Sequence, residues 1–382
     1  MRLLHTADWH VGRQIRGRSR ADEHRSVLDE ISRIAEQREV DVVIVAGDLF
    51  ETAAPTAESE QIVYSTLLRL ATIAQRVVVI AGNHDNPRRL AAVSPLLELG
   101  NVIALSEAAR PHEGGVQSIT LDGGERLNLA LLPFVSQRGI VRVEQLMAED
   151  PDQHAQTYAE RVARVIASLC APLEQATGAV NVLAGHLTVS GGLLGGGERS
   201  VHTLGAYAVP AGAFSSALHY VALGHLHRTQ EMAAPCPSWY CGSPLQLDFG
   251  EENDSKHVLV IDAEAGRPAK IDQVPLTEGR RLRTLAGSLG ELIPQSDSIG
   301  EDWLRVRVHE VARPGLADDV REHFPNAVEV MIERLEDRDT PARPRRIGRQ
   351  PGELFAEYLE LNDIEDPRLI ALFAELHEEA GA

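Results

Sequence analysis

Five short apolar segments of the sequence each end at a polar residue that can bind a metal ion. Four of them pass through a glycine first: residues 40–47, 77–82, 180–185 and 220–224 run into Asp48, Asn83-His84-Asp85, His186 and His225-Leu226-His227. The fifth, residues 3–7, runs directly into Asp8-Trp9-His10. Nitrogen and oxygen donors without thiolate suit divalent ions such as manganese, iron or zinc. The sequence therefore predicts a metal centre built from five separate segments.

The elements that must position these side chains are strands. Apolar runs rich in valine and isoleucine are typical of strands buried on both faces. A glycine at the end of a strand permits a sharp turn and a close approach of the backbone. Ligands gather at the carboxyl ends of strands in open α/β sheets, so we expect two aspartates, one asparagine and five histidines at one rim. Any one of these short motifs alone is typical of an ordinary turn; only the set is informative.

The composition restricts the kind of protein. With 37 Lys and Arg against 56 Asp and Glu, the chain carries a net charge of −19, which argues against coating nucleic acid through bulk charge but allows a local DNA groove. Three cysteines, Cys170, Cys236 and Cys241, make no disulfide framework and are typical of plain thiols in a reducing cytosol. Neither a leader nor an apolar run of ~18 residues is found, so we expect a cytoplasmic protein without a membrane span.

The chain is predicted to have four parts. Residues 1–275 alternate strands and helices and contain every candidate ligand, whereas residues 276–337 are expected to form a small α+β domain with none. Residues 338–351 hold five arginines and three prolines and predict a stiff linker. Residues 352–382 predict two short amphipathic helices, and helices this short need a partner for their apolar faces. Phe355 and Phe373 are the predicted anchors of that contact.

Taken together, the motifs resemble those of the calcineurin-like metallophosphoesterases, and most closely the DNA nucleases among them. The resemblance rests on Asp8-x-His10, Gly47-Asp48, Gly82-Asn83-His84-Asp85, Gly185-His186 and Gly224-His225-x-His227, and extends over nearly the whole chain. It implies an α/β fold of four layers, in which two central mixed sheets are flanked by helices. It also implies a small additional domain and a helical tail.

The resemblance implies a site with two divalent metal ions, of which manganese is the expected one. Asp8, His10, Asp48 and His227 would hold the first ion. Asp48, Asn83, His186 and His225 would hold the second, with Asp48 as the bridge. Two such ions supply an activated nucleophile and neutralise the charge on the phosphoryl oxygens.

His84 and Glu51 are the predicted catalytic residues. The resemblance implies that His84 contacts the phosphoryl group and protonates the leaving oxygen. Glu51 lies three residues after Asp48, where related phosphatases place an acid that orients this histidine. The alternatives are that Glu51 is a surface residue opening a loop, or that Asp85 orients His84 instead.

The implied function is a metal-dependent DNA nuclease that acts as a double-strand 3′–5′ exonuclease and as a single-strand and hairpin endonuclease. Its implied partners are DNA, an ATPase with a long coiled coil, and a second copy of the chain bound through helices near residues 56–100. The alternative is another metallophosphoesterase, such as a nucleotide or cyclic-nucleotide phosphodiesterase. A protein phosphatase is disfavoured, because Asp-Arg-Gly does not follow Gly47-Asp48 and the third motif ends in Asp85 rather than glutamate.

Two further segments are candidates for phosphate contacts. A loop after the first strand carries four arginines, Arg13, Arg16, Arg18 and Arg20, which either bind phosphate or are simply solvated. Residues 190–197 contain five glycines directly after the segment of His186 and predict a mobile loop whose amides could cradle phosphate.

Overall fold

The computed structural model describes residues 1–136, 139–140, 143, 158–198, 208–333, 355, 359, 368–369 and 372–373. The chain divides into two compact units, Met1–Glu333 and Arg334–Ala382. The predicted linker, residues 338–351, lies outside the described residues.

The first large sheet has six strands in the order β14-β13-β1-β4-β5-β6. Its parallel strands are β1 (Arg2–Thr6), β4 (Val42–Val45), β5 (Arg76–Ile80) and β6 (Val102–Leu105). The strands β13 (His257–Asp262) and β14 (Lys270–Pro275) join it in antiparallel fashion, so the sheet is mixed. All four residues of β4 are buried, as expected for a strand covered on both faces.

The second large sheet also has six strands, in the order β11-β12-β10-β9-β8-β7. Its parallel strands are β8 (Arg126–Leu132), β9 (Val180–His186), β10 (Tyr220–Gly224) and β12 (Ser238–Tyr240). The edge strands β7 (Val116–Thr120) and β11 (Gln230–Met232) are antiparallel to their neighbours. This sheet is therefore mixed as well, and every residue of β9 and β10 is buried.

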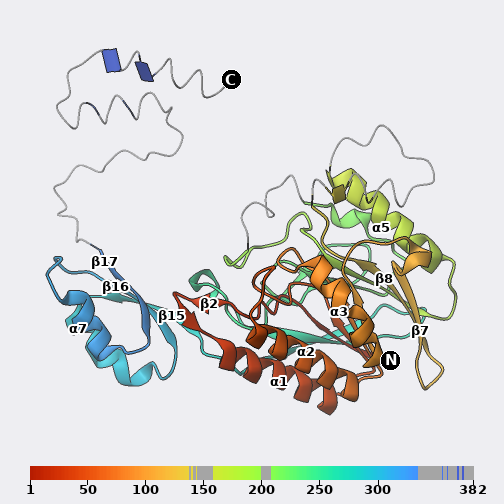
Figure 1. Cartoon of the computed structure of the whole chain (residues 1–382), viewed down its shortest axis with the longest axis horizontal. Helices are drawn as coiled ribbons and strands as arrows, with labels where there is room; N and C mark the ends of the chain where they lie inside the picture. The colour runs from red at the N-terminus through yellow and green to blue at the C-terminus, as the bar shows by residue number, and fades with distance from the viewer. Residues whose placement is uncertain are drawn as a thin grey trace. The chain divides into compact units, whose positions relative to one another are not determined.

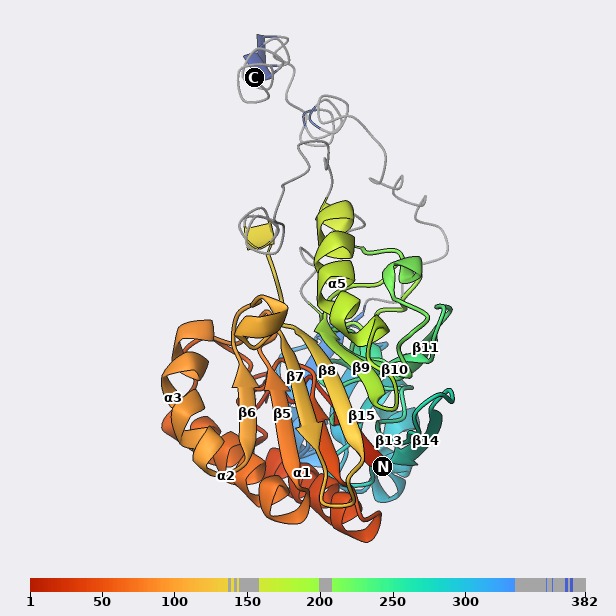
Figure 2. The same ribbon diagram turned by 90° about the vertical axis from the view of Figure 1, so that its right-hand side faces the viewer.

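Helices cover the outer face of each sheet. On the first sheet these are α1 (Ala21–Gln37), α2 (Ala57–Ile73) and α3 (Pro87–Leu99), and on the second α5 (Tyr158–Glu174) (Figures 1 and 2). The inner faces meet in a core that includes Leu3, Ile44 and Val78 from the first sheet and Leu129 and Val182 from the second. The predicted four-layer arrangement, with two central mixed sheets flanked by helices, is confirmed.

Helix starts follow local chemistry. The side chain of Thr56 accepts the amide of Ser59 at the start of α2. Asn86 accepts the amides of Arg88 and Arg89, with a proline in the first position of α3. Such caps satisfy amides that have no partner within the helix. The cap of α3 lies only three residues after the candidate ligand Asn83, so the start of this helix is fixed close to the site.

A small domain follows β14, the edge strand of the first sheet, and has its own core of apolar residues, among them Val306, Leu316 and Phe324. Its strands are β15 (Leu282–Gly287), β16 (Trp303–Val308) and β17 (Ala327–Ile332), and its helices include α6 (Leu289–Leu292) and α7 (Leu316–His323). The three strands are all parallel, so strands and helices alternate more regularly than the prediction of an α+β domain implies. Parallel neighbours need a crossover, and the two helical connections provide it.

The described residues of the second unit include Phe355 and Phe373, whose rings stack with centroids 4.3 Å apart. The two tail segments thus contact each other through the predicted anchors. Within the part of the chain that the structure describes, we find no helix with the length and apolar character needed to cross a membrane.

Candidate metal centre

The predicted ligands lie at or just after the carboxyl ends of five parallel strands from the two large sheets. Asp8 and His10 follow β1, Asp48 follows β4, and Asn83 follows β5; His186 ends β9, and His225 and His227 follow β10. Glycine is required where these ends meet. A Cβ on Gly47 would overlap the ring of His186, and one on Gly82 would overlap the carboxylate of Asp48. Gly47 therefore lets an end of the first sheet approach an end of the second, and Gly82 lets two ends of the first sheet approach each other.

The backbone at the centre is held in an unusual conformation. Asp8, His10, Asp48 and His225 all have positive φ, at 52°, 46°, 52° and 101°. Residues other than glycine rarely adopt this region, and it is kept only where the surroundings enforce it. Among the described residues, the other non-glycine positions with this conformation are Arg16, Glu39 and Asn101. The strain therefore marks this rim as a site that the fold is built to hold.

The side chains form two groups joined by Asp48. Asp8, His10 and His227 present ligand atoms within 4.8 Å of one another, and so do Asp48, His186 and His225. The Oδ2 atom of Asp48 lies 3.5 Å from Nε2 of His10 and 3.5 Å from Nε2 of His186. One carboxylate oxygen is thus placed between the two groups, where a bridging ligand must be.

Asn83 completes the second group. Its Oδ1 lies 3.0 Å from Nε2 of His186 and 2.8 Å from Nδ1 of His225. His84 is also near: a third set of ligand atoms within 4.8 Å consists of His10, Asp48 and His84. The structure therefore brings together all seven predicted ligands and the predicted catalytic histidine.

The residues present fit a centre with two divalent ions. The donors are imidazole nitrogens, carboxylates and one amide oxygen, all nearly inaccessible to solvent except Asn83. Among the described residues, Nε2 of His10 is buried and has no hydrogen-bond partner. A buried polar atom without a partner is costly, and coordination to a cation would satisfy it. Asp8 holds its own orientation by accepting the amide of His225 at 2.9 Å.

Each of four histidines is fixed through its Nδ1 atom. His10 Nδ1 contacts Glu51 at 3.0 Å, His227 Nδ1 contacts Glu251 at 3.1 Å, and His186 Nδ1 contacts the carbonyl of Ala46 at 2.8 Å. His84 Nδ1 contacts the carbonyl of Glu51 at 2.7 Å. Such partners fix the ring orientation and leave Nε2 for the metal or the substrate.

The contact predicted between the Glu51 carboxylate and His84 is not the one that the structure shows. The carboxylate contacts His10 and the Arg13 guanidinium, and it is the main-chain carbonyl of Glu51 that reaches His84. Asp85 is directed elsewhere. Its carboxylate accepts the amides of Gly82, Leu49 and Phe50, so it joins the turns after β4 and β5.

Burial and neighbouring charges compete in the electrostatics of the centre, and burial prevails at Asp8 and His10. Burial raises the pKa of Asp8 to about 7 and lowers the pKa of His10 to about 4. Burial acts the same way on Asp48, but the charges of His186, His10 and His84 outweigh it and hold the pKa of that carboxyl well below its usual range. A dication at this position would further favour the ionised carboxylates and neutral imidazoles that coordination requires.

Several residues around the centre carry no signal in the sequence. Glu251 is fully buried behind His227 and pairs with Lys256 at 2.6 Å. Phe134 stacks against His225, with ring centroids 6.2 Å apart, and forms a wall of the second group. Each lies in a loop or at an irregular position far from its partner in the chain. Only the spatial arrangement reveals them.

The arginine loop and the glycine loop differ from their predicted roles. Arg20 is buried and contacts Glu23 and the carbonyl of Gln246, and Arg16 pairs with Glu329 at 3.1 Å. Both arginines join parts of the protein, Arg20 from a buried position and Arg16 from a partly exposed one. In the glycine-rich segment the amides of Gly195 and Gly196 both donate to Glu198. Their hydrogen bonds are used within the loop, so these two amides are not open to a phosphate.

The carboxylate of Glu198 also accepts the amide of His227 at 3.0 Å. This contact fastens the glycine-rich segment to the metal centre, so the segment is anchored where the sequence predicts a mobile loop.

The predicted plain thiols agree with the structure, in which Cys170, Cys236 and Cys241 are all buried and free.

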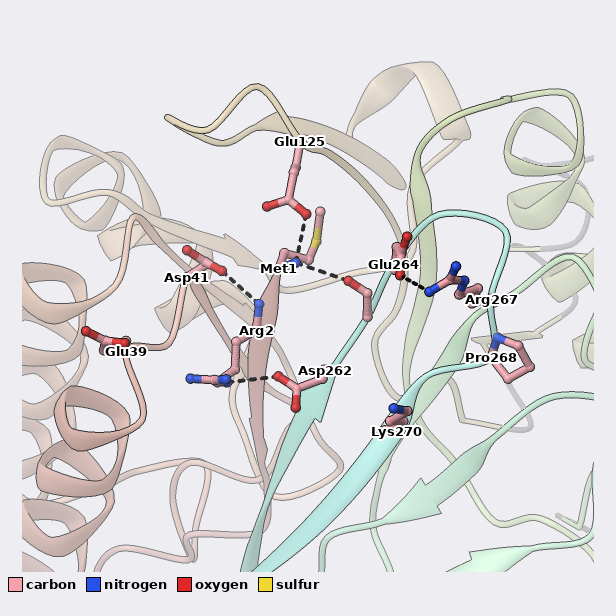
Figure 3. Close-up of a pocket in the computed structure, with 11 residues that line it drawn as sticks. Met1, Arg2, Glu39, Asp41, Glu125, Asp262, Glu264, Arg267, Pro268 and Lys270 are labelled. Atoms are coloured by element: carbon pink, nitrogen blue, oxygen red, sulfur yellow. Dashed lines mark hydrogen bonds and ion pairs between the residues drawn. The ribbon is translucent and has the colours of Figure 1, made fainter.

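A hollow of about 550 Å³ lies at the other end of β1, next to Met1 and Arg2 (Figure 3). Its charged groups largely neutralise one another. The Met1 amine contacts Glu125 at 2.8 Å, Arg2 contacts Asp262 at 2.9 Å, and Arg267 contacts Glu264 at 2.8 Å. The hollow is lined by none of the predicted ligands, so the chemistry belongs to the opposite rim.

Comparison with known proteins agrees with this geometry. Residues 1–229 match the family model of the calcineurin-like phosphoesterases. The chain is 36% identical over 286 residues to the SbcD component of nuclease SbcCD from Bacillus subtilis, an alignment that covers 74% of this chain and 71% of that protein. It is 27% identical to the SbcD component from Escherichia coli K12 over 97% of this chain and 92% of that protein. The corresponding protein of Rhodobacter capsulatus is 34% identical over 70% of this chain and 67% of that protein.

Proposed function

We propose that this chain, which belongs to the calcineurin-like phosphoesterases and within them to the SbcD family of nucleases, hydrolyses the phosphodiester bonds of DNA with two divalent metal ions. The observation that carries this proposal is the position of Asp48 Oδ2, 3.5 Å from a ring nitrogen of each ligand group. A single carboxylate oxygen between two ligand sets is the arrangement that a two-metal phosphoesterase needs.

The metal ions are proposed to be Mn²⁺. Asp8, His10, Asp48 and His227 would hold one ion, and Asp48, Asn83, His186 and His225 the other. When bound, the pair supplies an activated nucleophile and neutralises charge on the phosphoryl oxygens. Oxygen and imidazole donors without thiolate suit Mn²⁺.

His84 is the proposed acid for the leaving oxygen. Because its Nδ1 atom is tied to the carbonyl of Glu51 at 2.7 Å, its ring cannot turn freely and Nε2 is the atom left for the substrate. The ring lies edge-on to that of His10, with centroids 4.6 Å apart, so it borders the first ligand group. A protonated His84 would donate to the leaving oxygen as the phosphorus–oxygen bond breaks. Glu51 serves this step through its carbonyl and the first ligand group through its carboxylate.

The proposed substrates are double-stranded DNA degraded from 3′ ends and single strands or hairpins cut internally. The proposed partner is an ATPase of the SbcC type, bound through the tail at residues 352–382. Leu372 is half-exposed next to Phe373 in the chain, which supports an apolar contact of the tail with another protein. The proposed location is the cytoplasm at the nucleoid, which a DNA substrate supports.

A homodimer through α2 and α3 is also proposed. Leu68 on α2 and Leu96 and Leu99 on α3 are 43%, 69% and 86% exposed. Large apolar side chains exposed on two neighbouring helices favour burial against another copy. Replacing Leu96 and Leu99 with glutamate would give monomers in analytical ultracentrifugation, whereas an unchanged dimer would rule out this face.

The proposed activity is tested by digestion of end-labelled duplex and hairpin DNA with Mn²⁺, Mg²⁺ or Zn²⁺. A phosphomonoester and a cyclic nucleotide serve as controls. Metal-dependent cleavage of DNA with little turnover of either control supports a nuclease. Preferred hydrolysis of the cyclic nucleotide would instead assign the chain to another branch of the phosphoesterases.

A further inference from the structure

The two groups of ligands are supported by different kinds of residue. Both histidines of the first group, His10 and His227, contact a carboxylate through Nδ1, at 3.0 and 3.1 Å. In the second group His186 contacts a neutral main-chain carbonyl, that of Ala46, at 2.8 Å. A carboxylate behind an imidazole makes the ligating nitrogen more basic and holds the ring more firmly than a carbonyl does.

Glu251 is the more unusual of the two carboxylates because it has no exposed surface. A buried carboxylate needs compensating contacts, and Glu251 has a full set of them. Its Oε2 lies 2.6 Å from Nζ of Lys256 and accepts the amide of Leu247 at 3.1 Å. Oε1 remains for His227.

Lys256 strengthens the same arrangement from the other side. Its Nζ donates to the carbonyl of His227 at 3.0 Å and to Oγ of Ser243 at 3.0 Å. The ring and the main chain of His227 are thus both tied to one buried ion pair. Glu198 adds a third tie through the His227 amide. A residue held by its ring and by both main-chain polar groups has little freedom to leave a bound ion.

Glu51 supports His10 in a comparable way from the opposite side. Its Oε2 contacts the ring, and its Oε1 accepts a hydrogen bond from Arg13 at 2.8 Å. Each carboxylate behind the first group therefore has its own cation, Lys256 or Arg13. The two ion pairs both lie behind histidines of the first group.

We infer that the two metal positions are unequal: the Asp8–His10–His227 position binds its ion more tightly, and Glu251 with Lys256 is the positioning pair that makes it so. The inference rests on the proposed two-metal site and extends it to residues that do not touch either ion. Glu251 and Lys256 act through His227 alone.

The test is a titration of the metal-free full-length chain with Mn²⁺, in which calorimetry and the electron paramagnetic resonance signal of free Mn²⁺ count bound ions. The variant E251Q/K256M removes both charges of the buried pair together, which a folded core tolerates better than the loss of one. The single variant E251Q keeps the shape of the side chain. A matched control, E264Q/R267M, removes an exposed ion pair, in which the guanidinium of Arg267 lies 2.8 Å from the carboxylate of Glu264.

The wild type is expected to show two classes of site. E251Q/K256M should weaken the tighter class about 10- to 100-fold and leave the weaker class unchanged, while E264Q/R267M changes neither. In parallel, H186A should remove the weaker class and retain the tighter one.

A folded E251Q/K256M variant with two wild-type affinities would overturn the inference, as would a loss confined to the weaker class. If circular dichroism shows that the double variant does not fold, the same titration is made with the single variant E251Q. The inference then stands or falls on whether E251Q weakens the tighter class of site alone. A wild-type chain that binds fewer than two ions would contradict the proposed function itself, so the two failures are distinguishable.

Discussion

The metal centre and the small domain at 282–332 are held in place by opposite means. The centre is assembled from strand ends of both large sheets, is nearly closed to solvent and contains four strained backbone positions. The small domain contacts the rest through an apolar cluster around Phe249 and Leu282 and through partly exposed pairs such as Arg16–Glu329. A rigid site suits bond breaking, whereas a domain held by partly exposed polar contacts suits the placement of a large substrate.

The largest effect is expected from removal of Asp48, the carboxylate proposed to bridge the two metal ions. Asp48→Ala should deplete both metal positions and reduce hydrolysis of bis-p-nitrophenyl phosphate by about 10³-fold or more, because the pair of ions contributes several kcal/mol. Metal content by mass spectrometry and the rate of ester hydrolysis are measured together. Two tightly bound ions per chain in this variant would contradict the role of Asp48.

Removal of the small domain separates the positioning of DNA from the hydrolysis of the phosphodiester bond. Truncation after Leu282 should leave ester hydrolysis within about threefold of wild type, while cleavage of duplex DNA falls by about 10²-fold because the substrate loses its positioning surface. Truncation after Glu333, which removes only the tail unit, is the matched control. An equal loss of both activities would make the small domain part of the catalytic core.

The tail offers a weaker but more specific perturbation. Leu372→Asp should reduce co-purification with the SbcC-type ATPase without changing ester hydrolysis, because Leu372 is half-exposed. Phe355→Asp with Phe373→Asp should have a larger effect, since it also breaks a ring stack worth about 0.5–1.5 kcal/mol. Wild-type binding by both variants would leave the tail as a brace within its own chain.

The smallest expected effect concerns the seam between helix α1 and the small domain, to which Glu23 contributes. Glu23 accepts hydrogen bonds from Trp303 and from the amide of Arg280. Burial would raise the pKa of Glu23, but Arg20 and these donors hold it below the ordinary value of 4.5. The contribution to stability is therefore present above pH 4.5 and is lost as the pH falls through the lowered pKa of the folded state.

Glu23→Gln should accordingly destabilise the folded chain by about 1–3 kcal/mol at pH 7, the cost of losing hydrogen bonds to a charged group. The difference in melting temperature between variant and wild type should shrink below pH 4.5, as measured by scanning calorimetry. A difference that stays constant from pH 7 to pH 3 would show that the charge of Glu23 does not hold the seam.

The ligands could be predicted from the sequence because each lies beside its own strand. A valine-rich run, a glycine and a donor are neighbours in the chain, as in Val79–Asn83, and parallel strands place their ends at one edge. The direction of a side chain carries no such local signal. Glu51 lies near His84, as the sequence predicts. Its carboxylate, however, contacts His10, and only its main-chain carbonyl contacts His84.

Supporting residues escape prediction for the same reason. Glu251 meets His227 across 24 positions, from a 3₁₀ turn, η4 (Phe249–Glu251), that has no periodicity. Arg16 and Glu329 are 313 positions apart, so a loop rich in arginine could not be distinguished from a phosphate site. Long-range pairing of polar side chains is decided by the fold, and the sequence shows it only where a motif fixes both partners.

In the proposed mechanism seven residues bind the metal ions and His84 acts on the leaving oxygen. The variant His84→Ala tests this assignment most directly. We predict that this variant binds two ions per chain with near wild-type affinity and adopts the wild-type fold. We predict that it does not hydrolyse duplex DNA at a measurable rate, because the leaving oxygen of DNA loses the acid that protonates it. Hydrolysis of bis-p-nitrophenyl phosphate should fall much less, because its leaving group departs as a stable phenolate without a proton. Metal content and both rates are measured on one preparation. Wild-type hydrolysis of duplex DNA, or loss of both ions, would show that His84 is not the catalytic acid of this site.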